Sequence, residues 1–242
     1  MVSRRALLGA GALGVMPAAW AGGAAAARSA QVRGPRAGEP GQQPGPSEAL
    51  DRLRAGNDSW VEDQARHPDA SVPRRHEVAA GQHPFAVVFS CIDSRVPPEL
   101  VFDQGLGDLF VVRTAAHTLD DLVTGSLEYG PEELATPLLL VLGHQRCGAV
   151  TAAVQSIHDG EPLPGHLRDI VEQLRGPYQE VLRCGGGLDG AALVDAVVRE
   201  QTRQTVAALR ADELLAPRVA DGTLLVAGGY YSLDTGAVTF SV

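Results

Sequence analysis

The 242-residue sequence contains no lysine, and all 20 of its basic side chains are arginine. This absence excludes every enzyme class that needs a lysine to form a Schiff base, to bind phosphate in a P-loop or to act as a general base. The simplest explanation is a GC-rich genome, which favours arginine over lysine and also favours the abundant alanine and glycine.

The sequence is also poor in positive charge, because 29 Asp and Glu side chains outnumber the arginines and give a formal net charge of −9. A nucleic-acid-binding protein would need a basic face, so no nucleic-acid partner is expected. With 45% hydrophobic residues the chain can bury a normal core. Its length suits one α/β domain with a tail.

Cysteine is scarce as well, with three residues at Cys91, Cys147 and Cys184. An odd number of cysteines does not make a disulfide framework. Each of the three thiols is therefore a candidate for a role of its own.

Residues 1–27 are typical of an export signal. Ser3-Arg4-Arg5 has the twin-arginine form, and the apolar stretch Ala6–Ala19 is too short for a comfortable membrane span. Ala19-Trp20-Ala21 and Ala25-Ala26-Ala27 are candidate cleavage sites. The expectation is export to the periplasm, cell envelope or exterior, without stable membrane insertion after cleavage; an uncleaved anchor is the alternative.

Residues 28–46 are rich in proline and glycine and predict a disordered linker, which leaves 47–242 as the folded domain. The twin-arginine route carries folded proteins. Two thiolates could therefore bind a metal in the reducing cytoplasm before export.

Short apolar runs alternate with helical stretches through the folded part. A helix capped by Ser47 is expected first, with Gly56-Asn57 weakening its middle. Strands are predicted at 85–90, 109–112, 137–142 and 224–227, helices at 121–134, 147–158, 166–183 and 190–215, and a hairpin at 230–242. This alternation predicts an α/β fold with a central, mostly parallel β-sheet flanked by helices.

Reactive side chains follow two of the predicted strands. Cys91-Ile92-Asp93-Ser94-Arg95 comes directly after strand 85–90, and Gly143-His144-Gln145-Arg146-Cys147 comes directly after strand 137–142. Open α/β sheets place ligand sites beyond the carboxyl ends of their strands. In an extended segment Cys91, Asp93 and Arg95 would share one face.

The second segment adds two candidate metal ligands. His144 and Cys147 are three residues apart, so one helical turn would bring them together, and a helix N-terminus favours the Cys147 thiolate. If the two strands are neighbours, Cys91 joins them in a set typical of catalytic zinc with an open fourth position.

The thiols also have uses other than a zinc site. A single buried cysteine is often only a small apolar core residue. A redox dithiol is disfavoured because the sequence has no Cys-x-x-Cys. Cys184 has no partner pattern and is interpreted as structural or incidental.

The segments Cys91-Ile92-Asp93-Ser94-Arg95-Val96-Pro97 and Gly143-His144-Gln145-Arg146-Cys147-Gly148 resemble the two signature motifs of the β-class carbonic anhydrases. The resemblance extends over residues 47–242 and includes Gly125-Ser126-Leu127-Glu128-Tyr129 and Asp234-Thr235-Gly236. It implies an enzyme that reversibly hydrates carbon dioxide to bicarbonate and a proton, using zinc-bound hydroxide. It also implies an N-terminal helical arm that embraces a partner, in a homodimer or higher homo-oligomer.

By this resemblance, one Zn²⁺ per chain is held by Cys91, His144 and Cys147, and Asp93 with Arg95 forms the catalytic dyad. Gln82, nine residues before Cys91, matches a substrate-binding glutamine of the plant-type members. The residue chemistry agrees with these roles. Asp93 can accept a hydrogen bond from the hydroxide, Arg95 can hold Asp93 ionised, and Gln82 can donate to a bicarbonate oxygen.

Three further positions bear on the resemblance. Val96 and Phe102, with residues of a partner chain, are candidates for an apolar carbon dioxide pocket. Val88 stands where a bicarbonate-inhibited subtype has tryptophan, so an open, uninhibited site is expected.

The loop Ala115-Ala116-His117 departs from the Ala-Gly-Asn of many members. Its His117 is either a proton shuttle or a conformational substitute.

Two rival functions remain at this point. One is a hydrolase of carbonyl sulfide or carbon disulfide on the same scaffold, and the other is a non-catalytic, zinc-stabilised oligomer.

Overall fold

The computed structural model describes residues 43–184 and 187–242. The predicted signal at 1–27 and all but the last residues of the predicted linker at 28–46 lie outside the described residues.

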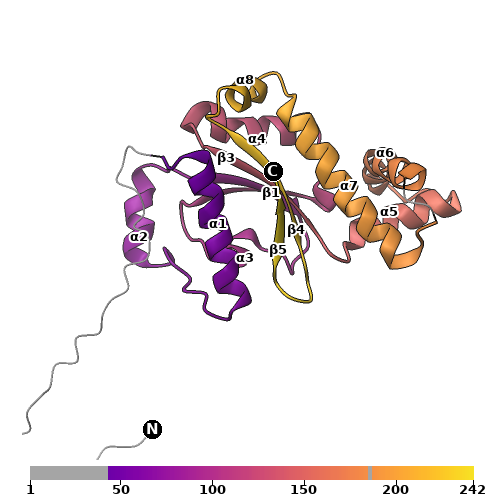
Figure 1. Ribbon diagram of the computed structural model, residues 1–242, viewed down its shortest axis with the longest axis horizontal. Helices are drawn as coiled ribbons and strands as arrows, with labels where there is room; N and C mark the ends of the chain where they lie inside the picture. Colours follow the sequence, from indigo (N-terminus) through magenta and orange to yellow (C-terminus); the bar gives the residue numbers. More distant parts are fainter. Residues whose placement is uncertain (1–42, 185–186) are drawn as a thin grey trace, which may run out of the picture. The chain divides into compact units, whose positions relative to one another are not determined.

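A five-stranded sheet forms the centre of the described chain, in the order β2-β1-β3-β4-β5 (Figure 1). The strands are β1 (Ala86–Cys91), β2 (Leu109–Thr114), β3 (Leu138–His144), β4 (Leu225–Tyr231) and β5 (Val238–Ser241). The first four are parallel, and β5 returns antiparallel to β4. The predicted, mostly parallel sheet is therefore confirmed.

The sequence pattern explains why β1 and β3 are the central strands. Every residue of both strands is buried, as expected where helices cover both faces of a parallel sheet. The two strands pair directly, with Ser90 opposite Leu142, so their carboxyl ends meet at one edge of the sheet. The condition on which the metal-site prediction depended is met.

Helices cover both faces of the sheet. They are α1 (Pro46–Val61), α2 (Val72–Glu77), α3 (Pro98–Val101), α4 (Asp121–Leu134), α5 (Gly148–Asp159), α6 (Leu167–Cys184), α7 (Gly190–Arg210) and α8 (Leu215–Ala220), with 3-10 turns η1 (Val78–Ala80) and η2 (Ala115–His117). Helix α1 packs on one face through Leu50 and Leu53, and α4 and α7 pack on the other through Leu127 and Leu209. Helices α5 and α6 gather beside α7, away from α1 (Figure 1).

The start of α1 differs from the prediction. Pro46 occupies the first helical turn and Gly45 is the N-cap, without any side-chain cap from Ser47. Proline suits this position because its fixed φ is already helical and its missing N–H has no intrahelical partner there. Gly56-Asn57 does not weaken the helix. A Cβ on Gly56 would overlap the Phe102 carbonyl, and Asn57 is buried.

The predicted helix 190–215 is two helices. Helix α7 ends at Arg210 and α8 begins at Leu215. The Asp212 carboxylate accepts hydrogen bonds from the backbone N–H groups of Leu214 (3.0 Å) and Leu215 (3.1 Å), which starts the second helix in a new direction. The apolar pattern continues through the break, so periodicity alone could not locate it.

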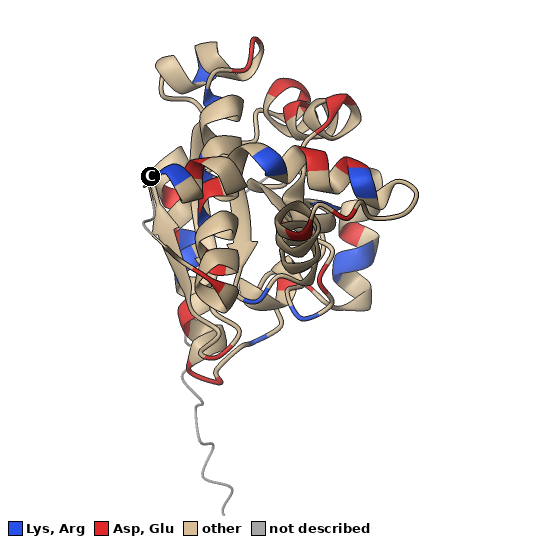
Figure 2. Ribbon diagram, turned by 90° about the vertical axis from the view of Figure 1, so that its right-hand side faces the viewer, with Lys and Arg blue, Asp and Glu red and all other residues tan. Residues whose placement is uncertain are grey.

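Charged residues of both signs lie on the helices. Acidic and basic residues are interspersed along the helices in Figure 2. Within the two described segments, no helix combines the length and apolar character needed to cross a membrane.

Candidate metal centre

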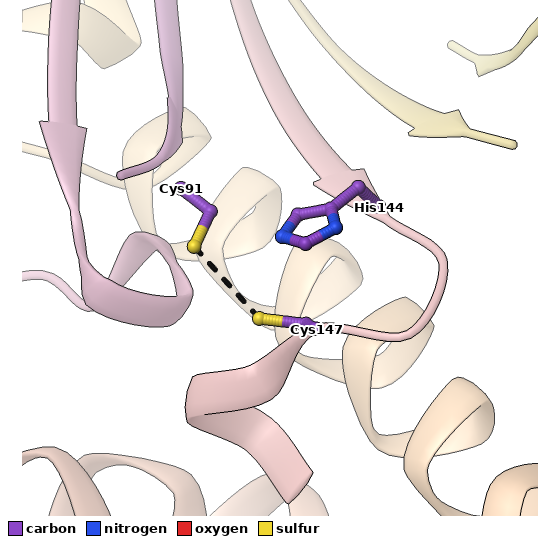
Figure 3. Close-up of side chains that lie close together, drawn as sticks. All are labelled: Cys91, His144 and Cys147. Carbon is purple, nitrogen blue, oxygen red and sulfur yellow. Dashed lines mark hydrogen bonds between the residues drawn. The ribbon is translucent and has the colours of Figure 1, made fainter. Parts of the chain in front are cut away.

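Three buried side chains converge at the carboxyl edge of the sheet. Cys91 is the last residue of β1, His144 is the last residue of β3, and Cys147 is the N-cap of α5. Their ligand atoms all lie within 4.8 Å of one another, and the two sulfurs are 3.8 Å apart (Figure 3). Each residue is at most 2% exposed. The structure thus brings together the three predicted ligands.

A two-residue turn sets the spacing of His144 and Cys147. The sequence predicted one helical turn here, but α5 begins only at Gly148. The chain instead reverses at Gln145-Arg146, where Arg146 has a left-handed φ of 52°. This turn places Cys147 at the N-terminus of α5, as predicted.

His144 provides the test of whether a metal fits. Its Nδ1 lies 3.0 Å from the Gln145 carbonyl oxygen, so this nitrogen carries the proton and donates. Its Nε2 is buried without any hydrogen-bond partner among the described residues. An unpaired buried nitrogen is costly. A borderline-soft cation between this lone pair and the two sulfurs would satisfy it, so the residues fit zinc.

The two thiols also indicate a place for a cation. A hydrogen bond from the Cys147 thiol lowers the pKa of Cys91 to about 4, and the same hydrogen bond raises the pKa of Cys147. The Ala116 N–H donates to the Cys91 sulfur at 3.3 Å. Hydrogen bonds from the backbone at Ala149 and Val150 act to lower the pKa of Cys147. A bound metal would replace the shared proton and favour both thiolates.

Asp93 and Arg95 form a closed ion pair beside the cluster. Asp93 Oδ1 accepts from the Arg95 backbone N–H at 3.0 Å and from Nε at 2.9 Å, and Oδ2 accepts from Nη2 at 2.7 Å. The hydrogen bond from Arg95 lowers the pKa of Asp93 to about 2. Asp93 Oδ2 lies 3.9 Å from the unpartnered Nε2 of His144.

The geometry that joins this pair differs from the prediction. Strand β1 ends at Cys91, and the chain then turns, with the Val96 N–H donating to the Asp93 carbonyl at 3.1 Å. Asp93 and Arg95 therefore do not meet because side chains alternate along an extended segment, as predicted. They meet because the chain turns between them.

Arg113, in β2, supports this turn, a role that the sequence motifs do not predict. Its Nε donates to the Cys91 carbonyl at 2.8 Å, and its Nη2 donates to the Asp93 carbonyl at 2.5 Å. One arginine thus holds the backbone of a ligand and of the dyad acid. The available signal was a charged residue near the end of an otherwise apolar strand.

Gln82 does not join the cluster within one chain. It is exposed and precedes β1, whereas Cys91 ends that strand. The five steps from Ala86 to Cys91 alone span roughly 16 Å.

Val96 and Phe102, the candidates for a carbon dioxide pocket, are both 0% exposed in the core beneath α1. Val88 is likewise buried in β1. Cys184 ends α6 on the surface, with its sulfur 3.3 Å from a Glu180 oxygen.

The geometry of His117 favours the conformational alternative over the proton shuttle. His117 is 1% exposed, its Nε2 is 3.3 Å from the Thr202 hydroxyl, and burial lowers its pKa to about 4. His117 and Ala116 both adopt left-handed φ values, 43° and 54°. The loop therefore adopts a left-handed conformation for which glycine and asparagine are the usual residues.

Comparison with known proteins agrees with this site. A family model described as carbonic anhydrase matches residues 86–238. Carbonic anhydrase 2 of Mycobacterium tuberculosis is 45% identical over 192 residues, which cover 79% of this chain and 90% of the relative. A carbonic anhydrase of Mycolicibacterium smegmatis is 42% identical over 194 residues, covering 80% and 92%.

A solved structure of the β-carbonic anhydrase CcaA is 26% identical in sequence and has a TM-score of 0.64. The match covers 80% of this chain and 92% of the CcaA chain. The chain therefore belongs to the carbonic anhydrases, a family of enzymes, and has the fold of their β class.

Proposed function

We propose that the chain binds one Zn²⁺ through Cys91, His144 and Cys147 and reversibly hydrates carbon dioxide to bicarbonate and a proton. The observation that carries this proposal is the buried Nε2 of His144. It has no hydrogen-bond partner in the described part of the chain and lies near two thiols and the ionised Asp93. The family to which the chain belongs supports the same reaction.

The donor set defines the chemistry. Two thiolates and one neutral imidazole balance the charge of a divalent cation and leave a fourth position free, as in catalytic sites. When bound, the zinc supplies a Lewis acid that lowers the pKa of water and so provides a nucleophile near neutral pH.

Asp93 would orient that nucleophile. With its pKa near 2 it is a carboxylate at neutral pH, and a carboxylate only accepts hydrogen bonds. Arg95 donates two hydrogen bonds to Oδ1 and one to Oδ2. Oδ2 therefore keeps a lone pair next to the metal ligands. This lone pair can accept a hydrogen bond from the nucleophile and so direct the nucleophile's own lone pair at carbon dioxide.

Arg95 would act through Asp93. Its planar guanidinium grips both carboxylate oxygens, which fixes the acid's rotation as well as its charge. A second contact, from Nη2 to the Arg146 carbonyl at 3.3 Å, holds the guanidinium itself. The dyad is thus attached to the turn between two metal ligands.

The substrate role of Gln82 would require a second copy of the chain, because Gln82 and Cys91 lie at opposite ends of β1. We propose a homodimer or a higher homo-oligomer. Support comes from the surface beside edge strand β2, where α4 exposes Leu122 (85%) and Tyr129 (52%). Sedimentation of the purified chain as a monomer at micromolar concentration would contradict this assembly.

Export by the twin-arginine pathway is proposed from Ser3-Arg4-Arg5 and the small apolar stretch that follows. Replacing both arginines by lysine should retain the protein in the cytoplasm, as measured by cell fractionation against the unmodified chain.

The reaction is tested by metal analysis and stopped-flow hydration of carbon dioxide. We expect about one zinc per chain and a hydration rate far above that of buffer. Zinc binding with no hydration would favour the non-catalytic oligomer. Sulfide release from carbonyl sulfide or carbon disulfide without carbon dioxide hydration would assign the chain to the hydrolases.

A further inference from the structure

The turn that separates His144 from Cys147 is held from outside by the C-terminal hairpin. The turn has only two residues, Gln145 and Arg146, and Arg146 is left-handed. Any change in this turn alters the separation of the two ligands it connects. The contacts that fix this turn therefore also fix the positions of the two metal ligands.

Both turn side chains bind the same carboxylate. Asp234 lies between β4 and β5, 88 residues beyond Arg146. Arg146 Nη1 donates to Asp234 Oδ2 at 2.9 Å, and Nη2 donates to Oδ1 at 2.7 Å. Gln145 Nε2 donates to Oδ2 at 2.9 Å. One acid thus accepts three hydrogen bonds from the two residues of the turn.

Two hydrogen bonds from backbone N–H groups also connect the turn to the hairpin. The Gln145 N–H donates to the Tyr231 carbonyl at 2.9 Å, and the Asp234 N–H donates to Gln145 Oε1 at 3.3 Å. Gln145 therefore both donates hydrogen bonds to the hairpin and accepts one from it, and Arg146 donates through its guanidinium.

The same turn reaches the dyad. The Arg146 carbonyl accepts from Arg95 Nη2 at 3.3 Å, and Arg95 holds Asp93. A continuous set of hydrogen bonds therefore runs from Asp234 through Arg146 and Arg95 to Asp93.

We propose that Asp234 is a positioning residue for the metal centre, acting through Gln145 and Arg146 to fix the turn between His144 and Cys147. The inference rests on the proposed metal site. The Arg146 and Asp234 side chains are 51% and 58% exposed, and exposed ion pairs contribute little to folding stability. The effect of Asp234 should consequently appear in metal retention rather than in unfolding.

The test is Asp234→Asn in the full, zinc-loaded chain, because asparagine preserves size but loses charge and one acceptor oxygen. Zinc release to an excess of chelator, followed with a metal-sensitive dye, should be about tenfold faster, as is usual when a group behind a metal ligand is lost. The thermal midpoint of the metal-free chain should not change. Arg146→Gln should have a similar effect on release, and the double variant should be no worse than either single variant.

Glu172→Gln is the matched control. Glu172 binds Arg175 through two hydrogen bonds of 2.9 and 2.7 Å, in an ion pair that is also exposed, but on α6. Its zinc release should equal that of the unmodified chain.

Two results would overturn the inference. One is zinc release from Asp234→Asn at the rate of the Glu172→Gln control. The other is loss of stability of the metal-free chain large enough to explain the faster release. Failure of the proposed function is distinguishable, because a chain that binds zinc but does not hydrate carbon dioxide still reports on Asp234. A chain that binds no zinc refutes both proposals.

Discussion

The metal ligands and the Asp93–Arg95 dyad are held in place in different ways. Cys91, His144 and Cys147 are at most 2% exposed, and each lies at the end of a strand or at the start of a helix. Asp93 and Arg95 stand on a turn, with side chains 14% and 51% exposed, and hydrogen bonds position them. The ligands depend on the packing of the sheet, whereas the dyad depends mainly on its own ion pair and on Arg113.

This difference separates folding from chemistry. Loss of a buried ligand leaves the other buried polar groups without a cation, so metal binding and stability should fall together. Loss of a dyad residue leaves the sheet and the ligands in place, so turnover should fall with at most a small change in stability. Variants of Cys147, Asp93 and Arg95 should separate the two effects, with the largest change at Cys147 and the smallest at Arg95.

Cys147→Ser should abolish zinc binding and carbon dioxide hydration, because a serine hydroxyl does not ionise near neutral pH. Free zinc at a thousand times its Kd should stabilise the unmodified chain by about 4 kcal/mol, and this gain should vanish in the variant. Metal analysis and urea unfolding with and without zinc measure both effects. Cys184→Ser, on the surface of α6, is the control and should behave as the unmodified chain does. A Cys147→Ser chain that keeps one zinc would refute the ligand assignment.

Asp93→Asn should retain zinc but lose about 100-fold or more of the hydration rate, because the amide NH2 that replaces one carboxylate oxygen cannot accept a hydrogen bond from the nucleophile. Stopped-flow hydration and metal content, measured on the same sample, separate the two effects. Asp169→Asn, which alters an exposed acid paired with His166, should change neither quantity. Full activity of Asp93→Asn would show that the dyad acid has been assigned wrongly.

Arg95→Ala should let the pKa of Asp93 rise from about 2 towards its ordinary value of 3.8. Because the pKa of Asp93 is depressed in the folded state, the ion pair stabilises the fold above about pH 4, and this stability is lost as pH falls towards 2. The half-exposed pair is worth at most about 1 kcal/mol. Urea unfolding should therefore show a small difference between Arg95→Ala and the unmodified chain at pH 6 that disappears near pH 2.

Arg95→Lys is the matched variant for this measurement, since it keeps the charge but loses the two-pronged grip. Its stability should lie between the other two. A difference that is constant from pH 6 to pH 2 would show that Arg95 stabilises the fold by packing instead.

Most of the sheet and the three ligands were predictable from the sequence. The runs at 85–90 and 137–142 are apolar throughout, which is typical of central parallel strands, and their polar continuations mark the ligand edge. The predicted strands end one residue before the end of β1 and two residues before the end of β3. Cys91 and His144 are polar in character but still pair within the sheet.

The supporting residues could not be predicted in the same way. Arg113 and Asp234 act on backbone and side chains far along the chain, and neither belongs to a local pattern that shows its partner. The Gln145-Arg146 turn was mistaken for a helical turn because both conformations bring residues three apart together.

The sequence by itself determined the class of the fold, the two reactive segments and the donor set, because residue type and spacing carry those properties. The absence of lysine excluded several chemistries on the same grounds. Only the tertiary structure decided that β1 and β3 are neighbours, that His144 Nε2 has no hydrogen-bond partner among the described residues, and that Asp234 binds both residues of the turn between the ligands. These are contacts between residues up to 89 positions apart. They are set by the packing of the whole sheet and not by any local preference of the chain.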